Sequence, residues 1–167
     1  MFKFSRKVPV SVLASVALCA VSTPSIAYAG QVVTNDMSKC TSNAGPAVLI
    51  EIRGFESDGG TLRVQSYRAT KAEWLEKGRW LNRIEQAVKP VNGVMRVCMP
   101  IPASGSYGIA VRHDTNGNKK TDIWKDGGGF SNNPKATIFN LGKPSAEKVA
   151  ISVGQHPTSI AIKLQYM

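Results

Sequence analysis

Ala47-Val48-Leu49-Ile50-Glu51-Ile52-Arg53 is the stretch that decides the fold class of this chain. Val48, Ile50 and Ile52 occupy alternate positions, with Glu51 and Arg53 on the opposite side. A period of two is typical of a strand that buries one face. Gly59-Gly60 then predicts a turn, and residues 61–67 alternate again. The sequence therefore predicts a hairpin formed by 47–53 and 61–67.

The same alternation recurs further along the chain. It is found at 94–99, 107–111, 149–153 and 160–164, and residues 136–141 are a further candidate for a short strand. The clearest helical signal is Thr70-Lys71-Ala72-Glu73, which has the spacing of a capping box and predicts a short helix at 71–77. Six or seven short strands without a β-α-β rhythm predict a mainly β protein. We expect a single antiparallel β-sandwich of about seven strands with one short helix.

The first 29 residues have the three parts of a secretory signal peptide. Lys3, Arg6 and Lys7 form a basic start, residues 8–20 are mostly apolar, and Ala27-Tyr28-Ala29 supplies small residues. This pattern predicts cleavage between Ala29 and Gly30 and a periplasmic or secreted protein. No later apolar run is long enough to span a membrane. We expect residues 30–46 to be an N-terminal arm and residues 47–167 to be one β-sandwich domain.

The charge of the chain is compatible with two kinds of behaviour. The formal charge of +10 falls to +7 when the three basic residues of the signal peptide are removed. A positive protein can contact an anionic envelope component such as lipopolysaccharide or an acidic glycan, or a protein partner. The basic residues are scattered along the sequence, so plain solubility is the alternative. Clustering on one sheet face would favour the anionic partner, and export argues against nucleic acid.

Cleavage would leave two cysteines, Cys40 and Cys98. In an oxidising compartment a lone pair most simply forms a disulfide, and no C-x-x-C spacing indicates redox chemistry. Met95, Val97 and Met99 would share the opposite face of the strand from Cys98. If the Met face is the core, the disulfide ties the arm across the outside of the sheet.

Residues 114–122 have the spacing of a calcium loop. Asp114, Asn116, Asn118 and Asp122 occupy relative positions 1, 3, 5 and 9, and Lys120 at position 7 would offer its carbonyl oxygen. Lys119 stands where such loops have glycine, and Lys125 stands where they have a bidentate glutamate. We expect either a weak calcium site, with a Kd of roughly 0.1–1 mM, or a polar hairpin loop without metal.

A second candidate loop follows three glycines, Gly127-Gly128-Gly129. Backbone N–H groups of glycines can face an anion, so Gly129, Phe130, Ser131 and Asn132 form a candidate ligand loop. No following Lys-Ser or Lys-Thr pair supports a nucleotide phosphate loop. The alternative is a flexible loop held by Phe130.

These two loops together carry a resemblance to a known family. Tyr107, the run His113-Asp114-x-Asn116-Gly117-Asn118, Asp122 and the run 129–133 resemble the exported bacterial family catalogued as domain of unknown function 2141. The resemblance covers about residues 48–164. It implies a small transthyretin-like or carboxypeptidase-regulatory-like β-sandwich and no assigned activity. Lys119 departs from the glycine usual in the family, and the segment between Asp122 and Gly129 is shortened.

The residues favour a binding or structural module over an enzyme. His113 and Asp114 are neighbours on a strand and would point to opposite faces, so they do not form a proton relay. No serine has an evident base beside it, and no zinc-type Cys/His set is present. We therefore expect a non-catalytic module. The alternatives are a carbohydrate- or envelope-binding module that stacks sugars on Tyr67, Trp74, Trp80 or Trp124, and, least favoured, an enzyme of unknown reaction.

Overall fold

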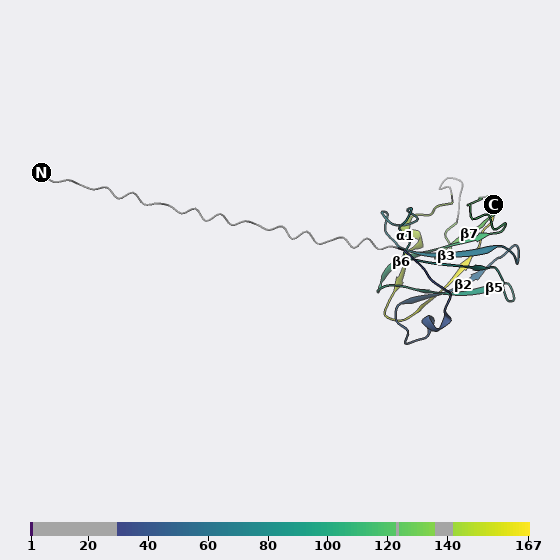
Figure 1. Ribbon diagram of the computed structural model, residues 1–167, viewed down its shortest axis with the longest axis horizontal. Coiled ribbons are helices and arrows are strands. Elements are labelled where there is room, and N and C mark those ends of the chain that lie inside the picture. Colours follow the sequence, from purple (N-terminus) through teal and green to yellow (C-terminus); the bar gives the residue numbers. More distant parts are fainter. Residues whose placement is uncertain (2–29, 123, 136–141) are drawn as a thin grey trace.

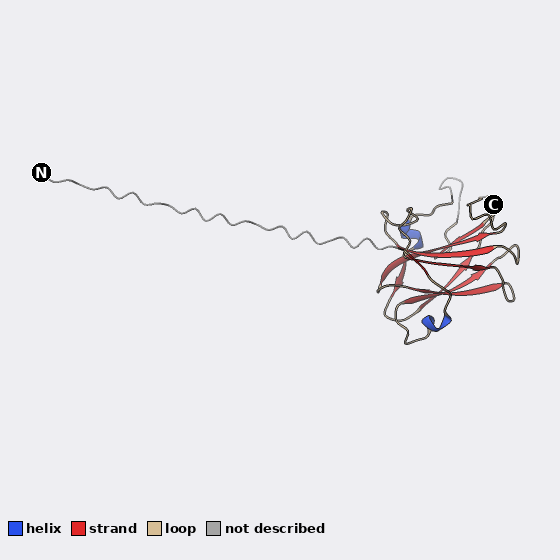
Figure 2. Cartoon of the chain, viewed as in Figure 1, coloured by secondary structure: helices blue, strands red, loops and turns tan. Residues whose placement is uncertain are grey.

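The computed structural model describes residue 1 and residues 30–122, 124–135 and 142–167. The expected signal peptide and the strand expected at 136–141 lie outside these residues. The described part folds into two β-sheets that pack face to face (Figures 1 and 2). No helix in these ranges is long and apolar enough to cross a membrane.

The larger sheet has the order β1-β4-β3-β6-β7, and β8 pairs with the same edge of β6 as β7 does. The smaller sheet has the order β5-β2-β9. The strands are β1 (Gln31–Val32), β2 (Ala47–Arg53), β3 (Thr61–Arg68), β4 (Asn82–Ala87), β5 (Val94–Pro100), β6 (Gly105–Asp114), β7 (Gly127–Phe130), β8 (Ile151–Val153) and β9 (Thr158–Lys163). Two short helices accompany them, the 3-10 helix η1 (Met37–Cys40) and α1 (Ala146–Val149).

A mainly β sandwich is confirmed, with differences in detail. The described residues form nine strands, and the β2–β9 and β1–β4 pairs are parallel. The core lies between the sheets, where the predicted inward faces meet. Val48, Ile50 and Ile52 of β2 are fully buried. So are Leu62 and Val64 of β3. Burial of each such side chain contributes roughly 1.5–3 kcal/mol.

The predicted hairpin between residues 47–53 and 61–67 is wrong. β2 belongs to the smaller sheet and β3 to the larger one, so the connection at 54–60 crosses the edge of the sandwich. Gly54 and Gly60 both have a φ of 82° in this connection. A period of two shows which face of a strand is buried, but it does not show which strand lies beside it.

The predicted helix at 71–77 is also wrong. The Thr70 carbonyl accepts hydrogen bonds from the N–H groups of Glu73 and Trp74, so one turn forms. Leu75 and Gly78, with positive φ angles of 56° and 75°, then end it. Of the apolar residues that follow, Ile84 lies in β4, which pairs with β3. Strand pairing has overridden a weak helical pattern, and α1 lies instead just before β8.

The N-terminal arm crosses from the larger sheet to the outer face of the smaller one. β1 pairs with β4, and η1 then carries Cys40 to Cys98 of β5. The predicted disulfide is confirmed, with a Cα–Cα distance of 5.8 Å. Met95, Val97 and Met99 face the core, so Cys98 lies on the outer face as predicted. Cys98 is nevertheless fully buried, because the arm covers it.

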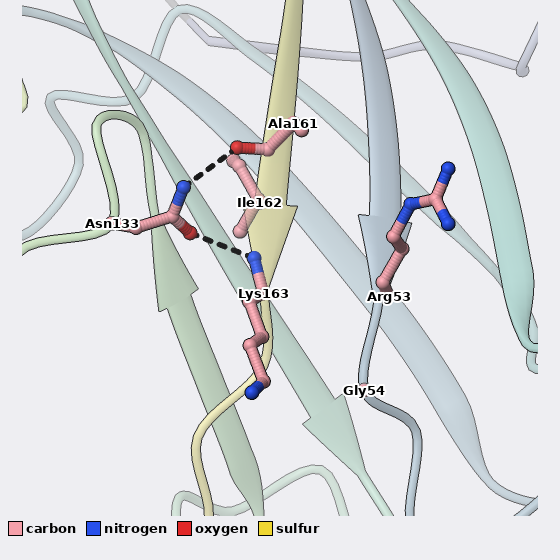
Figure 3. Close-up of a pocket in the computed structure, with 6 residues that line it drawn as sticks. All are labelled: Arg53, Gly54, Asn133, Ala161, Ile162 and Lys163. Carbon is pink, nitrogen blue, oxygen red and sulfur yellow. Dashed lines mark hydrogen bonds between the residues drawn. The ribbon is translucent and has the colours of Figure 1, made fainter.

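On each outer strand of the smaller sheet, the side-chain amide of one asparagine makes two hydrogen bonds to the strand backbone. On β5, Asn35 donates from Nδ2 to the Arg96 carbonyl (3.0 Å) and accepts the Cys98 N–H at Oδ1 (2.9 Å). On β9, Asn133 donates to the Ala161 carbonyl (2.8 Å) and accepts the Lys163 N–H (2.7 Å), as Figure 3 shows. Each amide thus makes the pair of hydrogen bonds that a neighbouring strand would make.

Candidate functional site

The loop that follows β6 is wound around the carboxyl group of Asp114. Asp114 is 2% exposed, and its Oδ2 accepts the Lys119 N–H at 2.8 Å. Asn116 Oδ1 accepts the Asn118 N–H (3.0 Å), and Asn118 Oδ1 accepts the Lys120 N–H (2.7 Å). These are two successive Asx turns. Lys119 has a φ of 64°, so it adopts the left-handed conformation that glycine usually supplies in such a loop.

Asp126 closes this loop and was not among the predicted ligands. Its Oδ1 accepts the Thr115 N–H (3.4 Å), and its Oδ2 accepts the Asp122 N–H (3.0 Å). Asp122 Oδ1 accepts a hydrogen bond from the Trp124 N–H (3.3 Å). Asp126 is 7% exposed, so its two hydrogen bonds stabilise a nearly buried carboxyl group. The only indication of this role in the sequence was that Asp126 stands one residue after the position where calcium loops have a glutamate.

One oxygen in the loop has no partner. Asp114 Oδ1 is buried and makes no hydrogen bond with any described residue. An orphaned carboxylate oxygen destabilises the folded state unless a cation or water contacts it. The described residues contain no group of three or more His, Cys, Asp and Glu side chains placed to hold a metal. A cation here would therefore depend on Asp114, amide oxygens and main-chain carbonyls, which are ligands of hard cations.

His113, beside this loop, has both ring nitrogens engaged. Nε2 lies 2.7 Å from the Gly59 carbonyl, which only accepts, so Nε2 carries a proton. Nδ1 lies 2.7 Å from the Tyr166 hydroxyl and accepts from it when the ring is neutral. The ring is fully buried and meets Phe55 edge-on. His113 thus fastens β6 to the β2–β3 connection and to the C-terminal segment.

The Tyr166 hydroxyl gives this contact a pH dependence. Burial raises the pKa of Tyr166, and that of Tyr67, above its ordinary value. A neutral phenol is then favoured in the folded state, so its contribution to stability is complete below about pH 10 and is lost as the pH rises through the raised pKa.

We expect the free energy of unfolding, measured by urea denaturation, to fall above about pH 10. Tyr166→Phe should be less stable at pH 7 and show a shallower alkaline fall; an unchanged slope would contradict this assignment.

The candidate ligand loop at 129–132 joins several elements. Ser131 Oγ accepts the Ile109 N–H (3.0 Å) and donates to the Val149 carbonyl (2.5 Å). Asn132 donates to the Ala150 carbonyl (2.9 Å), and Phe130 meets Trp74 edge-on at 5.9 Å. A Cβ on Gly129 would lie 2.6 Å from the Ile162 side chain. These contacts give residues 129–132 a structural role. Anion binding by this loop stays a prediction.

The four candidate sugar-stacking rings do not form one surface. Trp74 is 3% exposed and donates to the Pro144 carbonyl (2.9 Å), and Tyr67 packs edge-on against it. Trp80 lies under the guanidinium of Arg83, 4.2 Å from it. Trp124 is 72% exposed and makes no ring contact with another described aromatic residue. The described residues therefore offer no exposed coplanar pair.

The outer face of the larger sheet carries a basic cluster, which we call the arginine face: Arg63, Arg83 and Arg112. Arg63 of β3 lies directly opposite Arg112 of β6 and, on its other side, opposite Glu85 of β4. Arg83 lies opposite Gln65. The cluster adjoins an open hollow of about 620 Å³. Its lining includes Arg63, Gln65, Tyr67, Lys77, Arg83 and Thr121. The cluster is not apparent in the sequence, because only the pairing of β3 with β4 and β6 brings these residues together.

Comparison with known proteins gives one match. The model of the family described as "Uncharacterized protein conserved in bacteria (DUF2141)" matches residues 50–161. That range begins in β2, ends in β9 and includes both candidate loops and the arginine face. No curated protein matches the chain, and no solved structure does.

Proposed function

Since this chain belongs to the uncharacterised bacterial family of the domain of unknown function 2141, we propose from its own residues that it is an exported, non-catalytic β-sandwich module whose 114–126 loop binds calcium. Two features support export. Residues 1–29 have the pattern of a signal peptide, and a disulfide joins Cys40 to Cys98. Disulfides persist in oxidising compartments such as the periplasm.

The observation that carries the calcium proposal is the orphaned Oδ1 of Asp114. The carboxyl group is inside the loop, because its other oxygen accepts the Lys119 N–H. The Asn116 and Asn118 amide oxygens each accept one N–H and keep a second lone pair for a cation. The loop thus already has the turns that alternate calcium ligands require, including the left-handed residue at Lys119.

The same geometry makes the site weak. The Arg112 guanidinium lies 3.5 Å from Asp114 Oδ2 and offsets part of its negative charge. Both oxygens of Asp126 accept a backbone N–H and Asp122 Oδ1 accepts another, which leaves these carboxylates less free to turn toward a cation. Few anionic ligands give affinities in the range of extracellular calcium modules, roughly 0.1–1 mM. We propose that calcium fixes the shape of the loop.

The absence of a catalytic role rests on how the nucleophile and base candidates are bonded. Both nitrogens of His113 are engaged inside the fold, and the Ser131 hydroxyl is held between two backbone groups. His156 is bonded to the Ser42 carbonyl at the surface. No hydrogen bond joins any two of these three side chains, so they do not form a nucleophile–base pair.

Calcium should raise the thermal stability of the mature protein. Binding to the folded state alone adds RT ln(1 + [Ca²⁺]/Kd), or about 1.4 kcal/mol at tenfold excess over Kd. We expect the unfolding temperature to rise by several degrees in millimolar CaCl₂ relative to EDTA, and less in equal MgCl₂. Differential scanning calorimetry measures this rise.

Two variants separate metal binding from a general salt effect. Asn116→Ala removes an exposed ligand oxygen and should reduce the calcium-dependent rise while the protein still folds. Lys119→Gly relieves a left-handed conformation and should raise stability in EDTA by about 1 kcal/mol while the calcium response remains. An equal rise in CaCl₂ and MgCl₂, or one unaffected by Asn116→Ala, would refute the calcium proposal.

A further inference from the structure

The arginine face concentrates positive charge where a sheet would normally avoid it. Arg63 and Arg112 lie directly opposite each other across β3 and β6, and like charges in that relation are destabilising. Arg83 adds a third guanidinium next to them. Burial lowers the pKa of Arg83, the positive charge of Arg63 lowers it further, and the negative charge of Glu85 offsets part of this effect. Such repulsion is relieved when an anion binds between the charges.

The three guanidinium groups are held in place by other residues. Arg63 donates from Nε to Glu85 (2.5 Å), and Arg112 donates to Thr121 Oγ1 (3.0 Å). Arg83 is stacked on the Trp80 ring. Their side chains are only 15–24% exposed, so less conformational entropy remains to be lost when a ligand binds.

Two donors of the arginine face, Arg83 Nε and Arg112 Nε, have no hydrogen-bond partner among the described residues, although both are closed to solvent. The Arg83–Glu85 contact is 3.8 Å, which is too long for a hydrogen bond. The arginine side chains are thus only partly satisfied by the carboxylates beside them.

From these observations we propose that the hollow beside the arginine face binds a phosphorylated saccharide. Arg63 and Arg83 contribute guanidinium groups from two strands, with Lys77 on the rim and Arg112 beside Arg63. A phosphate ester offers three terminal oxygens in a tetrahedral arrangement and accepts hydrogen bonds from several directions, whereas a carboxylate offers two oxygens in one plane. The hollow of about 620 Å³ is within the range of small-molecule sites.

The rest of the hollow suits the sugar part of such a ligand. Gln65 and Thr121 offer polar groups that can bond hydroxyls, and Tyr67, Leu75 and Trp80 supply apolar surface. Glu76 on the rim is paired with Lys143 at 3.0 Å, which reduces its repulsion of an anion. The hollow adjoins the calcium loop: Thr121 belongs to both, and Arg112 contacts both Asp114 and Thr121.

The test is a titration of the mature protein with glucose 6-phosphate, inorganic phosphate, glucose and acetate. It is followed by two-dimensional NMR and run in EDTA, so its outcome does not depend on calcium. We expect glucose 6-phosphate to bind at millimolar concentration or below and to shift the Trp80 indole and Thr121 amide signals. Inorganic phosphate should bind more weakly, and glucose and acetate should shift these signals little.

Matched variants decide whether the arginine face is responsible. Arg83→Gln should weaken glucose 6-phosphate binding by about tenfold or more, because it removes charged donors. Arg96→Gln removes the same charge from the outer face of the smaller sheet, where Arg96 is 66% exposed, and should change affinity less than twofold. The proposal is overturned if glucose 6-phosphate does not bind, if acetate binds equally well, or if both variants have the same effect.

Discussion

Gly60→Ala is expected to destabilise the folded protein by roughly 2–6 kcal/mol. Gly60 has a φ of 82°, and holding a non-glycine residue there costs about 1–3 kcal/mol. A Cβ at this position would also lie 2.2 Å from the Asp114 carbonyl oxygen and 2.9 Å from Thr115 Cα. These are backbone atoms at the end of β6, so relief requires movement of the strand, with a further cost of about 1–3 kcal/mol.

Gly59→Ala is the matched control for this prediction. No heavy atom lies within 4 Å of a Cβ built there, and Gly59 does not have a positive φ. Its carbonyl can still accept from His113. Urea denaturation of both variants should show a large loss for Gly60→Ala and a small change for Gly59→Ala. Similar values would mean that the β2–β3 connection is not packed against β6 as described.

Removal of the disulfide is expected to have the second large effect. The bridge closes a loop across 58 positions of sequence, for which chain entropy gives about 4 kcal/mol. The double variant Cys40→Ala/Cys98→Ala should therefore unfold at a much lower urea concentration. Much of the loss should reflect the greater freedom of the unfolded chain, because Asn35 still bonds the arm to β5.

Reduction of the wild-type protein provides the control. In dithiothreitol its stability should fall to that of the double alanine variant, and the variant itself should not respond to the reductant. Equal stability of oxidised and reduced wild-type protein would contradict the prediction. A response of the variant to dithiothreitol would show that the effect arises elsewhere.

The buried faces of the strands were predictable, whereas the neighbours of each strand were not. The alternation of Val48, Ile50 and Ile52 placed the core side of β2 correctly. The same rule placed Cys98 on the outer face of β5. Pairing depends on long-range packing, so the expected hairpin was wrong and β4 was missed. The positive φ of Leu75 also had no local signal.

The candidate sites divide in the same way. The calcium-type spacing of Asp114, Asn116 and Asn118 is local, and the loop forms the turns that the spacing predicts. The arginine face depends on the register that places Arg63 opposite Arg112, 49 positions away in sequence. A pattern within one strand cannot relate residues so far apart in sequence. The basic residues are therefore scattered in the sequence and form a cluster only in the folded sheet.

The asparagine amides on the outer strands of the smaller sheet limit how this protein can recognise others. A peptide that added itself as an extra strand to β5 or β9 would first have to displace Asn35 or Asn133 from two hydrogen bonds. Recognition through backbone augmentation is thereby disfavoured at this sheet. At this sheet, selectivity for a partner would then come from side chains, whose sequence can vary without loss of the strand pairing.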